Sequence, residues 1–497
     1  MWAGRLATVA VALLLGFLLV AFRGEPIATS DQGVFLSVAA RMLDGDQLYS
    51  EVVDNKDPLF FYSYAGALWA GGWRGPFALE GLWLALAAIA IALTLYELRA
   101  PRAAVVTGFF LYPLGLTAAW YQPGLSMLGA LAIAPLAAWL WLRGQSIAAG
   151  AAVGVAILFK INLALVAGAP IAAFLLLGAS DRGRLRQLGH GALGLLAVLG
   201  GAAAFLAGRG ALTSYLDVLG YNVHYSASLN APGPLDGVRH HLEVLRGFFV
   251  AAGRWQAPAA LAALGVFVVA AVLGWTRGGP PFRALAAAAA AALVAVLTTI
   301  ALTALWNHHL QMLAYPAALG GAALVAAATI RFGNRLGVVA AATCILFAAW
   351  SSVKHEVAAG VSARAWSADA ISVPADELEK ARLRFHPSSA QVTYMVFGGN
   401  SENAHAVFVE DPFALSCRFF HLYPFSLEEQ FAETLACGAR EEPMLVLVTL
   451  GFFDDRAAEG SWGTFVRGAR RFLDTRYEKV GQAYPGFQVW TRRGMAS

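Results

Sequence analysis

The sequence predicts a polytopic α-helical membrane protein with a small α/β domain at its C-terminal end. Of its 497 residues, 59% are hydrophobic and only 13% are charged, whereas soluble domains carry roughly 25% charged residues. Long apolar runs recur up to about residue 352, and from about 375 the segments become shorter and more polar. The chain therefore divides into a transmembrane domain at 1–352 and an extracytoplasmic domain at 353–497.

The apolar runs predict about eleven transmembrane helices. The first, 6–22, has the length of a retained span that leaves the N-terminus in the cytoplasm. The next apolar segment, 58–69, is shorter than the ~20 residues that a crossing needs, so we expect it to dip into the membrane face within a long first outer loop at 23–76. The other spans are expected at 77–97, 103–119, 123–142, 146–160, 162–178, 189–207, 255–275, 284–305, 313–329 and 336–352.

Arginines set the direction of these spans. Without a crossing at 58–69, the arginines of the short connections all fall on the cytoplasmic side, as the positive-inside rule requires. They are Arg5, Arg99, Arg102, Arg143, Arg182, Arg184, Arg186, Arg277, Arg283, Arg331 and Arg335. The C-terminal domain is then extracytoplasmic, and the loop around Asp31, the Lys160-Ile161-Asn162 junction and the His308-His309 loop share its side of the membrane.

Charge and cysteines narrow the class of protein further. The net charge of +4 is dispersed over short loops, so it reflects membrane topology and says little about nucleic acid. A protein of this class has membrane lipid as a partner, and no basic–aromatic patch indicates a nucleic acid. Cys344 lies in an apolar run, whereas Cys417 and Cys437 lie in the C-terminal domain. In an oxidising compartment these two could pair or stay free, and their spacing leaves both alternatives open.

The C-terminal domain has alternating strand-like and helix-like segments. The segments 390–398, 443–451 and 486–492 are rich in Val, Thr and aromatic residues and predict strands. Amphipathic patterns at 427–440 and 462–477 predict helices.

The first outer loop carries the densest group of polar residues. Val34, Phe35, Val38 and Leu43 recur at helical spacing, which places Asp31 at the start of a short helix. A carboxylate there is favoured by the exposed N–H groups. Asp31 is therefore either a helix cap or an ionised group that acts as a base or a metal ligand.

Asp31, the following segment AARMLDGDQLY and the motif Asn55-Lys56-Asp57-Pro58 before an aromatic run resemble the GT-C membrane glycosyltransferases. The resemblance is to the branch of protein O-mannosyltransferases and aminoarabinose transferases, glycosyltransferase family 39. Two residues depart from the pattern. Gln32 stands where many of these enzymes have an acid, and Asp57 stands where a Lys-Pro-Pro motif has proline.

The resemblance implies a glycosyltransferase that moves a sugar, with inversion, from a polyprenyl-phosphate donor to a hydroxyl of a glycan, lipid or protein acceptor at the outer face. It implies that Asp31 is the general base. It also implies that cationic and imidazole groups hold the leaving lipid phosphate, namely Lys56, Arg74, Lys160, His308 and His309. No cofactor is firmly implied. The resemblance leaves open whether a divalent metal ion assists, and Gln32 in place of an acid weakens the case for one.

Four of the proposed phosphate contacts also have a plain structural interpretation. A lysine that ends a span, as Lys160 does, commonly extends to the interface. Adjacent histidines point about 100° apart on a helix, so His308 and His309 do not chelate one metal comfortably, and Lys56 could be a solvated loop residue.

Two rival classes of function remain. A transporter or lipid flippase would have as many spans, but it would carry ionisable groups in mid-membrane and internal repeats; the predicted spans are nearly free of charge and show no repeat. A scaffold protein without activity is the third alternative, and it would leave the outer polar groups dispersed.

Overall fold

The computed structural model describes residues 2–21, 31–118, 126–177, 181–229, 279–302, 307–358, 392–398, 413–419, 422, 428–449, 452–453, 460–483 and 487–494. The span predicted at 255–275 lies outside them. The boundary predicted near 353 falls inside a helix that continues to Ala358.

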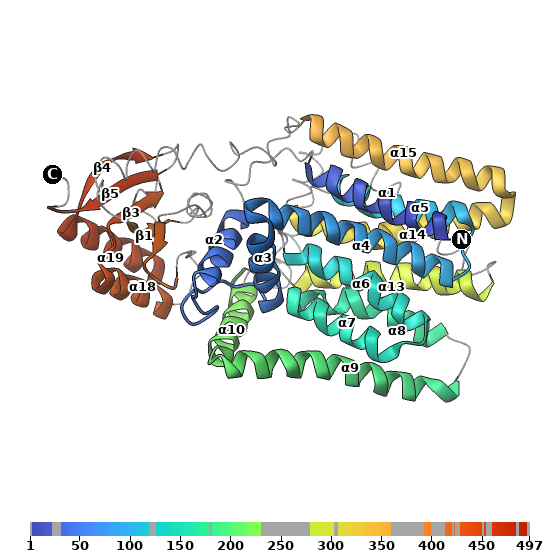
Figure 1. Cartoon of the computed structure of the whole chain (residues 1–497), viewed down its shortest axis with the longest axis horizontal. Helices are drawn as coiled ribbons and strands as arrows, with labels where there is room; N and C mark the ends of the chain where they lie inside the picture. Colours follow the sequence, from blue (N-terminus) through green and yellow to red (C-terminus); the bar gives the residue numbers. More distant parts are fainter. Residues whose placement is uncertain are drawn as a thin grey trace.

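A bundle of apolar helices forms the first part of the chain, and Figure 1 shows these helices running side by side. Four described segments are long and apolar enough to cross a membrane: Gly75–Glu97, Gly183–Gly208, Pro281–Ile300 and Gln311–Phe332. The bundle comprises α1 (Trp2–Ala21), α4 (Gly75–Glu97), α5 (Arg102–Ala118), α6 (Ser126–Leu142), α7 (Ser146–Phe159), α8 (Ala164–Leu177), α9 (Asp181–Gly208), α13 (Pro280–Leu302), α14 (Ala314–Phe332) and α15 (Asn334–Ala358).

Lipid supplies no hydrophobic drive for helix association, so helices in a membrane depend on close packing, which small residues permit. The α7–α9 contact depends on glycine in both helices. A Cβ atom added at Gly150 would lie 1.8 Å from the Gly191 carbonyl oxygen, and one at Gly194 would lie 1.9 Å from the carbonyl oxygen of Ile147. The alanine- and glycine-rich spans therefore serve packing.

Three helices lie across one end of the bundle, steeply inclined to the spans (Figure 1): α2 (Asp31–Leu43), α3 (Pro58–Gly71) and α10 (Leu212–Leu229). Helix α3 begins directly after Asp57, whose backbone is extended, and Pro58 fits its first turn because proline has no N–H to leave unpaired. At the other end of α3 a short 3₁₀ turn, η2 (Gly72–Arg74), leads into α4. The segment predicted to be too short to cross thus lies across the bundle end.

The last part of the chain is a five-stranded sheet with the order β2-β1-β3-β5-β4. Strands β1 (Val392–Phe397), β2 (Phe413–Leu415) and β3 (Leu445–Thr449) are parallel neighbours, and β5 (Phe487–Arg492) pairs antiparallel with β3 and with β4 (Tyr477–Ala483). Helices α18 (Glu428–Glu441) and α19 (Gly460–Arg476) pack against one face of the sheet.

Both faces of this sheet are buried. Met395, Phe397 and Val446 share a core with residues of α18 and α19. Their strand neighbours Tyr394 and Leu445 point to the opposite face, since successive side chains alternate, and they belong to the same continuous apolar core as the helical bundle. The sheet is therefore fixed to the bundle end that carries α2, next to which Figure 1 shows it.

Candidate functional site

A buried carboxylate organises the polar loop between α2 and α3. Asp57 is only 4% exposed. Its Oδ1 accepts a hydrogen bond from the Tyr215 hydroxyl of α10 at 2.7 Å, and its Oδ2 accepts one from the Ile161 backbone N–H at 2.9 Å. One side chain thus joins three parts of the chain: the loop before α3, the junction that follows α7, and helix α10.

Burial raises the pKa of the Asp57 carboxyl above its ordinary value, because a charged carboxylate loses its hydration. The hydrogen bonds from Tyr215 and Ile161 and the nearby ammonium groups of Lys160 and Lys56 oppose that rise. The pKa of Tyr215 is raised as well, by its own burial and then by Asp57, so its hydroxyl keeps the proton that it donates.

Further hydrogen bonds hold the backbone of the same loop. The Asn222 side chain of α10 donates to the Asn55 carbonyl oxygen at 2.8 Å, and the Tyr49 hydroxyl donates to the Lys56 carbonyl oxygen at 2.8 Å. The ring of Tyr49 lies 5.0 Å from that of Tyr215. The loop is therefore shaped by groups from distant parts of the chain.

Lys160 lies where the chain leaves α7. Its backbone is extended, with φ −162° and ψ 105°, and the 3₁₀ turn η3 (Ile161–Leu163) follows before α8 starts. The neighbouring Ile161 N–H is the one that Asp57 accepts. This geometry places Lys160 beside the first loop.

Lys56 lies against the start of α2. Its Nζ atom is 5.3 Å from the centre of the Phe35 ring and donates to the Asn55 side-chain oxygen. Asp31 begins α2 one helical turn before Phe35, and residues four apart share a helix face. The backbone of Asp31 is therefore placed at the Lys56 side of the helix.

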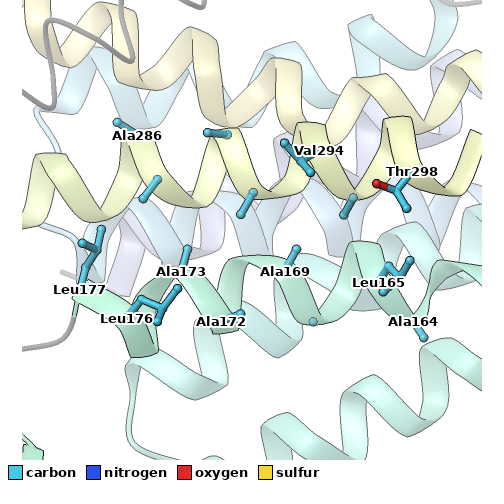
Figure 2. A pocket seen from close by; sticks show the side chains of 15 residues that line it. Ala164, Leu165, Ala169, Ala172, Ala173, Leu176, Leu177, Ala286, Val294 and Thr298 are labelled. Atoms are coloured by element: carbon cyan, nitrogen blue, oxygen red, sulfur yellow. The ribbon is translucent and has the colours of Figure 1, made fainter.

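An apolar groove of about 970 Å³ runs between α8 and α13. Figure 2 shows Ala164, Leu165 and Thr298 at one end and Leu176 at the other. Ala164 follows η3 directly, so the groove begins one 3₁₀ turn after Lys160. A helix of the length of α8, 14 residues, spans about 21 Å, and the groove therefore extends from the polar junction well along the bundle.

No protein-family model matches the sequence, and no curated protein matches it. The structure is similar to the crystal structure of ArnT from Cupriavidus metallidurans bound to undecaprenyl phosphate, with a TM-score of 0.59 and 13% identity over 100% of this chain and 99% of that chain.

The apo structure of the same ArnT gives a TM-score of 0.55, also at 13% identity, over 100% of this chain and 99% of that chain. The chain therefore shares the overall fold of this ArnT. An oligosaccharyltransferase from Archaeoglobus fulgidus, in complex with Zn and sulfate, is similar at a TM-score of 0.49 and 13% identity over 98% of this chain and 73% of that chain.

Within this fold, two of the residues singled out in the sequence, Lys56 and Lys160, lie in segments that meet at one end of the bundle. Asp57 bridges the loop of Lys56 to the junction of Lys160. Lys56 also lies against Phe35 of α2, the helix that begins at Asp31. Arg74 lies elsewhere: it is exposed at the far end of α3 from Lys56, and a helix of 14 residues is about 21 Å long.

The paired histidines lie in the 3₁₀ segment η4 (Asn307–Leu313), just before α14. His309 is buried; the side chain of His308 lies outside the described residues. Both η4 and η3 contact α13, and the Thr299 hydroxyl of α13 donates to the Asn162 carbonyl oxygen at 3.3 Å. The histidine segment and the Lys160 junction thus meet the same helix.

Sequence reasoning missed Tyr215 and Asn222. It noted Asp57 as a departure from Lys-Pro-Pro and as one of the carboxylates around Lys56 in a loop shaped by Pro58, but it gave Asp57 no role of its own. Its partner Tyr215 lies 158 residues further on, a separation that no local pattern reveals. Across the described segments, no three His, Cys, Asp or Glu side chains form a group suited to a metal ion.

The raised pKa of Asp57 predicts a definite pH dependence of stability. A carboxyl with a folded pKa above its unfolded value, about 3.9, stabilises the fold below that value and loses the contribution as pH rises through the folded pKa. The difference in stability between wild type and Asp57→Asn should therefore decrease as pH is raised above about 4. Thermal unfolding in detergent micelles at a series of pH values measures it.

The matched control is Asp474→Asn, because Asp474 is exposed on α19 in an ion pair with Arg470. A wild-type advantage over Asp57→Asn that grows with pH, or that follows the control, would contradict this assignment.

Proposed function

We propose that this protein is a membrane glycosyltransferase that takes a sugar from a polyprenyl-phosphate donor and transfers it to a hydroxyl of a glycan, lipid or protein acceptor. The observation that carries the proposal is that the hydrogen bond between Asp57 and the Ile161 N–H brings the segments of Lys56 and Lys160 together, and that the apolar groove begins at Ala164, four residues after Lys160. A polyprenyl-phosphate sugar has the matching form, a charged phosphate on a long apolar chain. The neighbouring GT-C structure with bound undecaprenyl phosphate supports this choice of donor.

The groove suits a lipid chain because its lining consists of Ala, Gly, Leu and Val side chains with a single threonine. Displacing membrane lipid with a polyprenyl chain costs little in such a groove, and specificity must then come from the phosphate. Ammonium groups bind phosphate strongly through charge-assisted hydrogen bonds. The donor would therefore lie with its phosphate at Lys56 and Lys160 and its chain along α8.

The transfer needs no further source of energy, since the donor is already activated. The acceptor oxygen bonds to the anomeric carbon from the face opposite the phosphate, and the bond from that carbon to the phosphate oxygen breaks. The acceptor proton passes to the Asp31 carboxylate, which acts as general base, and the polyprenyl phosphate leaves with the bonding electrons. Lys56 and Lys160 balance its charge, and His308 and His309 are proposed to assist. Arg74 lies at the far end of α3 from Lys56 and has no part in this step.

The site is proposed to face the extracytoplasmic side, as the arginine pattern predicts. The disulfide between Cys417 and Cys437 supports this placement, because disulfides persist in oxidising compartments. A transporter is the less favoured alternative. It would use ionisable groups along its spans, whereas the polar groups described above gather at one end.

Replacing Asp31 by asparagine should remove the proton acceptor. General-base catalysis typically contributes on the order of 10²–10⁴ in rate, so Asp31→Asn should lower kcat by about that factor while membrane insertion and melting temperature stay at the wild-type values. Release of polyprenyl phosphate by the purified protein, supplied with a panel of polyprenyl-phosphate sugars and acceptors, measures the rate. Undiminished transfer by the variant would exclude Asp31 as the base.

Replacing Lys160 by glutamine should weaken donor binding. A hydrogen bond to a charged group contributes about 1.5–3 kcal/mol, which corresponds to a rise of about ten- to a hundredfold in the donor KM. Lys479→Gln is the control, because Lys479 is exposed on β4 of the C-terminal sheet. Equal donor KM values for both variants would rule out a phosphate contact for Lys160, and lipid translocation without sugar transfer would favour the transporter.

A further inference from the structure

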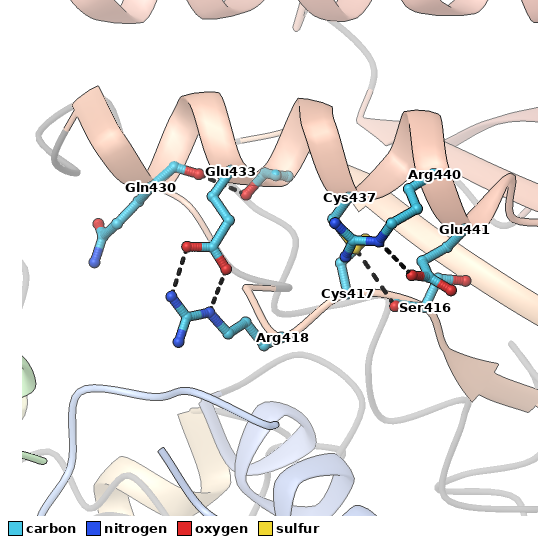
Figure 3. The surroundings of a disulfide bond; sticks show 9 residues. Ser416, Cys417, Arg418, Gln430, Glu433, Cys437, Arg440 and Glu441 are labelled. Carbon is cyan, nitrogen blue, oxygen red and sulfur yellow. Dashed lines mark hydrogen bonds and ion pairs between the residues drawn. A yellow bond between two sulfur atoms is a disulfide. The ribbon is translucent and has the colours of Figure 1, made fainter. Parts of the chain in front are cut away.

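A short segment of the C-terminal part, Ser416–Phe419, is fixed to its own sheet and helix. It continues from β2, and the Ser416 N–H donates to the Tyr394 carbonyl oxygen of β1 at 3.0 Å. Its two central residues are both tied to α18. Cys417 forms a disulfide with Cys437, and the Arg418 guanidinium donates through two of its nitrogens to the Glu433 carboxylate. Figure 3 shows both ties side by side under the helix.

Ser416–Phe419 also contacts the polar loop between α2 and α3. The Val53 N–H donates to the Arg418 carbonyl oxygen at 3.0 Å, and Val53 and Phe419 form a parallel β-bridge. Val53 directly precedes Asp54, and Lys56 comes only three residues after it. Arg418, whose carbonyl oxygen accepts the hydrogen bond from Val53, is thus anchored by its own ion pair with Glu433 and by the disulfide of its neighbour Cys417.

This contact is continuous with a larger packed surface. The bundle-side face of the sheet, with Tyr394, Val396 and Leu447, belongs to the apolar core of the bundle. Arg41 of α2 is close enough to Tyr394 to lower the pKa of its hydroxyl slightly against the rise caused by burial. The sheet can therefore act as a rigid support for the loop.

We propose that Ser416–Phe419 is a positioning element that holds Lys56 in its place for the donor phosphate, so that the C-terminal domain is part of the donor site. The proposal deepens the proposed function and depends on it for the identity of the ligand. The residues of the segment touch no substrate and act through Val53. Releasing Val53 would let the 53–56 backbone sample more conformations, and ordering it again on donor binding costs free energy.

Two variants release the segment in different ways. Cys417→Ser combined with Cys437→Ser removes the covalent tie, and Arg418→Ala removes the ion pair while it leaves the disulfide intact. Arg440→Ala is the matched control, because Arg440 lies on the same helix in an exposed pair with Glu441. Arg418→Glu combined with Glu433→Arg should restore what Arg418→Ala loses.

The test is hydrogen exchange of the 47–57 backbone in the full-length protein in micelles, followed by the donor KM. We expect exchange of the Val53 amide to rise at least several-fold in both releasing variants, with wild-type exchange in the control and in the charge-swapped pair. The donor KM should rise about threefold to tenfold, with kcat changed less than twofold.

Unchanged exchange in both releasing variants would overturn the proposal, and so would faster exchange with an unchanged donor KM. If the wild type transfers no sugar from any donor, the proposed function fails, but faster exchange confined to 47–57 would still support the positioning contact.

Discussion

The site depends on one buried carboxylate with two donors. A chain that leaves α7 at Phe159 and starts α8 at Ala164 exposes backbone N–H groups at the break. Asp57 accepts the Ile161 N–H from a different part of the chain, and Tyr215 completes its hydrogen bonding. Burying a charged group is costly unless it is paired. This constraint fixes the first loop, the α7–α8 junction and α10 relative to one another.

The proposed phosphate site depends on that arrangement. Lys56 is the residue before Asp57 and Lys160 the residue before Ile161, so the hydrogen bond between Asp57 and the Ile161 N–H brings the two lysine-bearing segments together, and the groove begins at Ala164, four residues after Lys160. The carboxylate also offsets the repulsion between two cations. The C-terminal sheet supports the loop from the other side through Val53. The polar loop before α3 and one end of the apolar groove thus lie at the same end of the bundle.

Much of the bundle could be predicted because apolar runs and arginines are local signals. The predicted spans 146–160 and 162–178 match α7 and α8 to within two residues at each end, since Lys160 and Asn162 interrupt the apolar run. Strands β1, β3 and β5 were predicted from their Val and aromatic content. β2 and β4 were missed. β2 has only three residues, too few for a pattern, and the sequence of β4, YEKVGQA, is mostly polar. The role of Asp57 could not be predicted, because each of its partners is more than a hundred residues away.

Asp57 and Tyr215 act together to hold the loop that we propose binds the donor phosphate. A double-mutant cycle with Asp57→Asn and Tyr215→Phe measures this cooperation, with the dissociation constant for undecaprenyl phosphate in nanodiscs as the measured quantity. We expect each variant to weaken binding and the double variant to bind little more weakly than the poorer single one, a coupling on the order of 1 kcal/mol. Unchanged affinity in the single variants, or strictly additive losses, would contradict it.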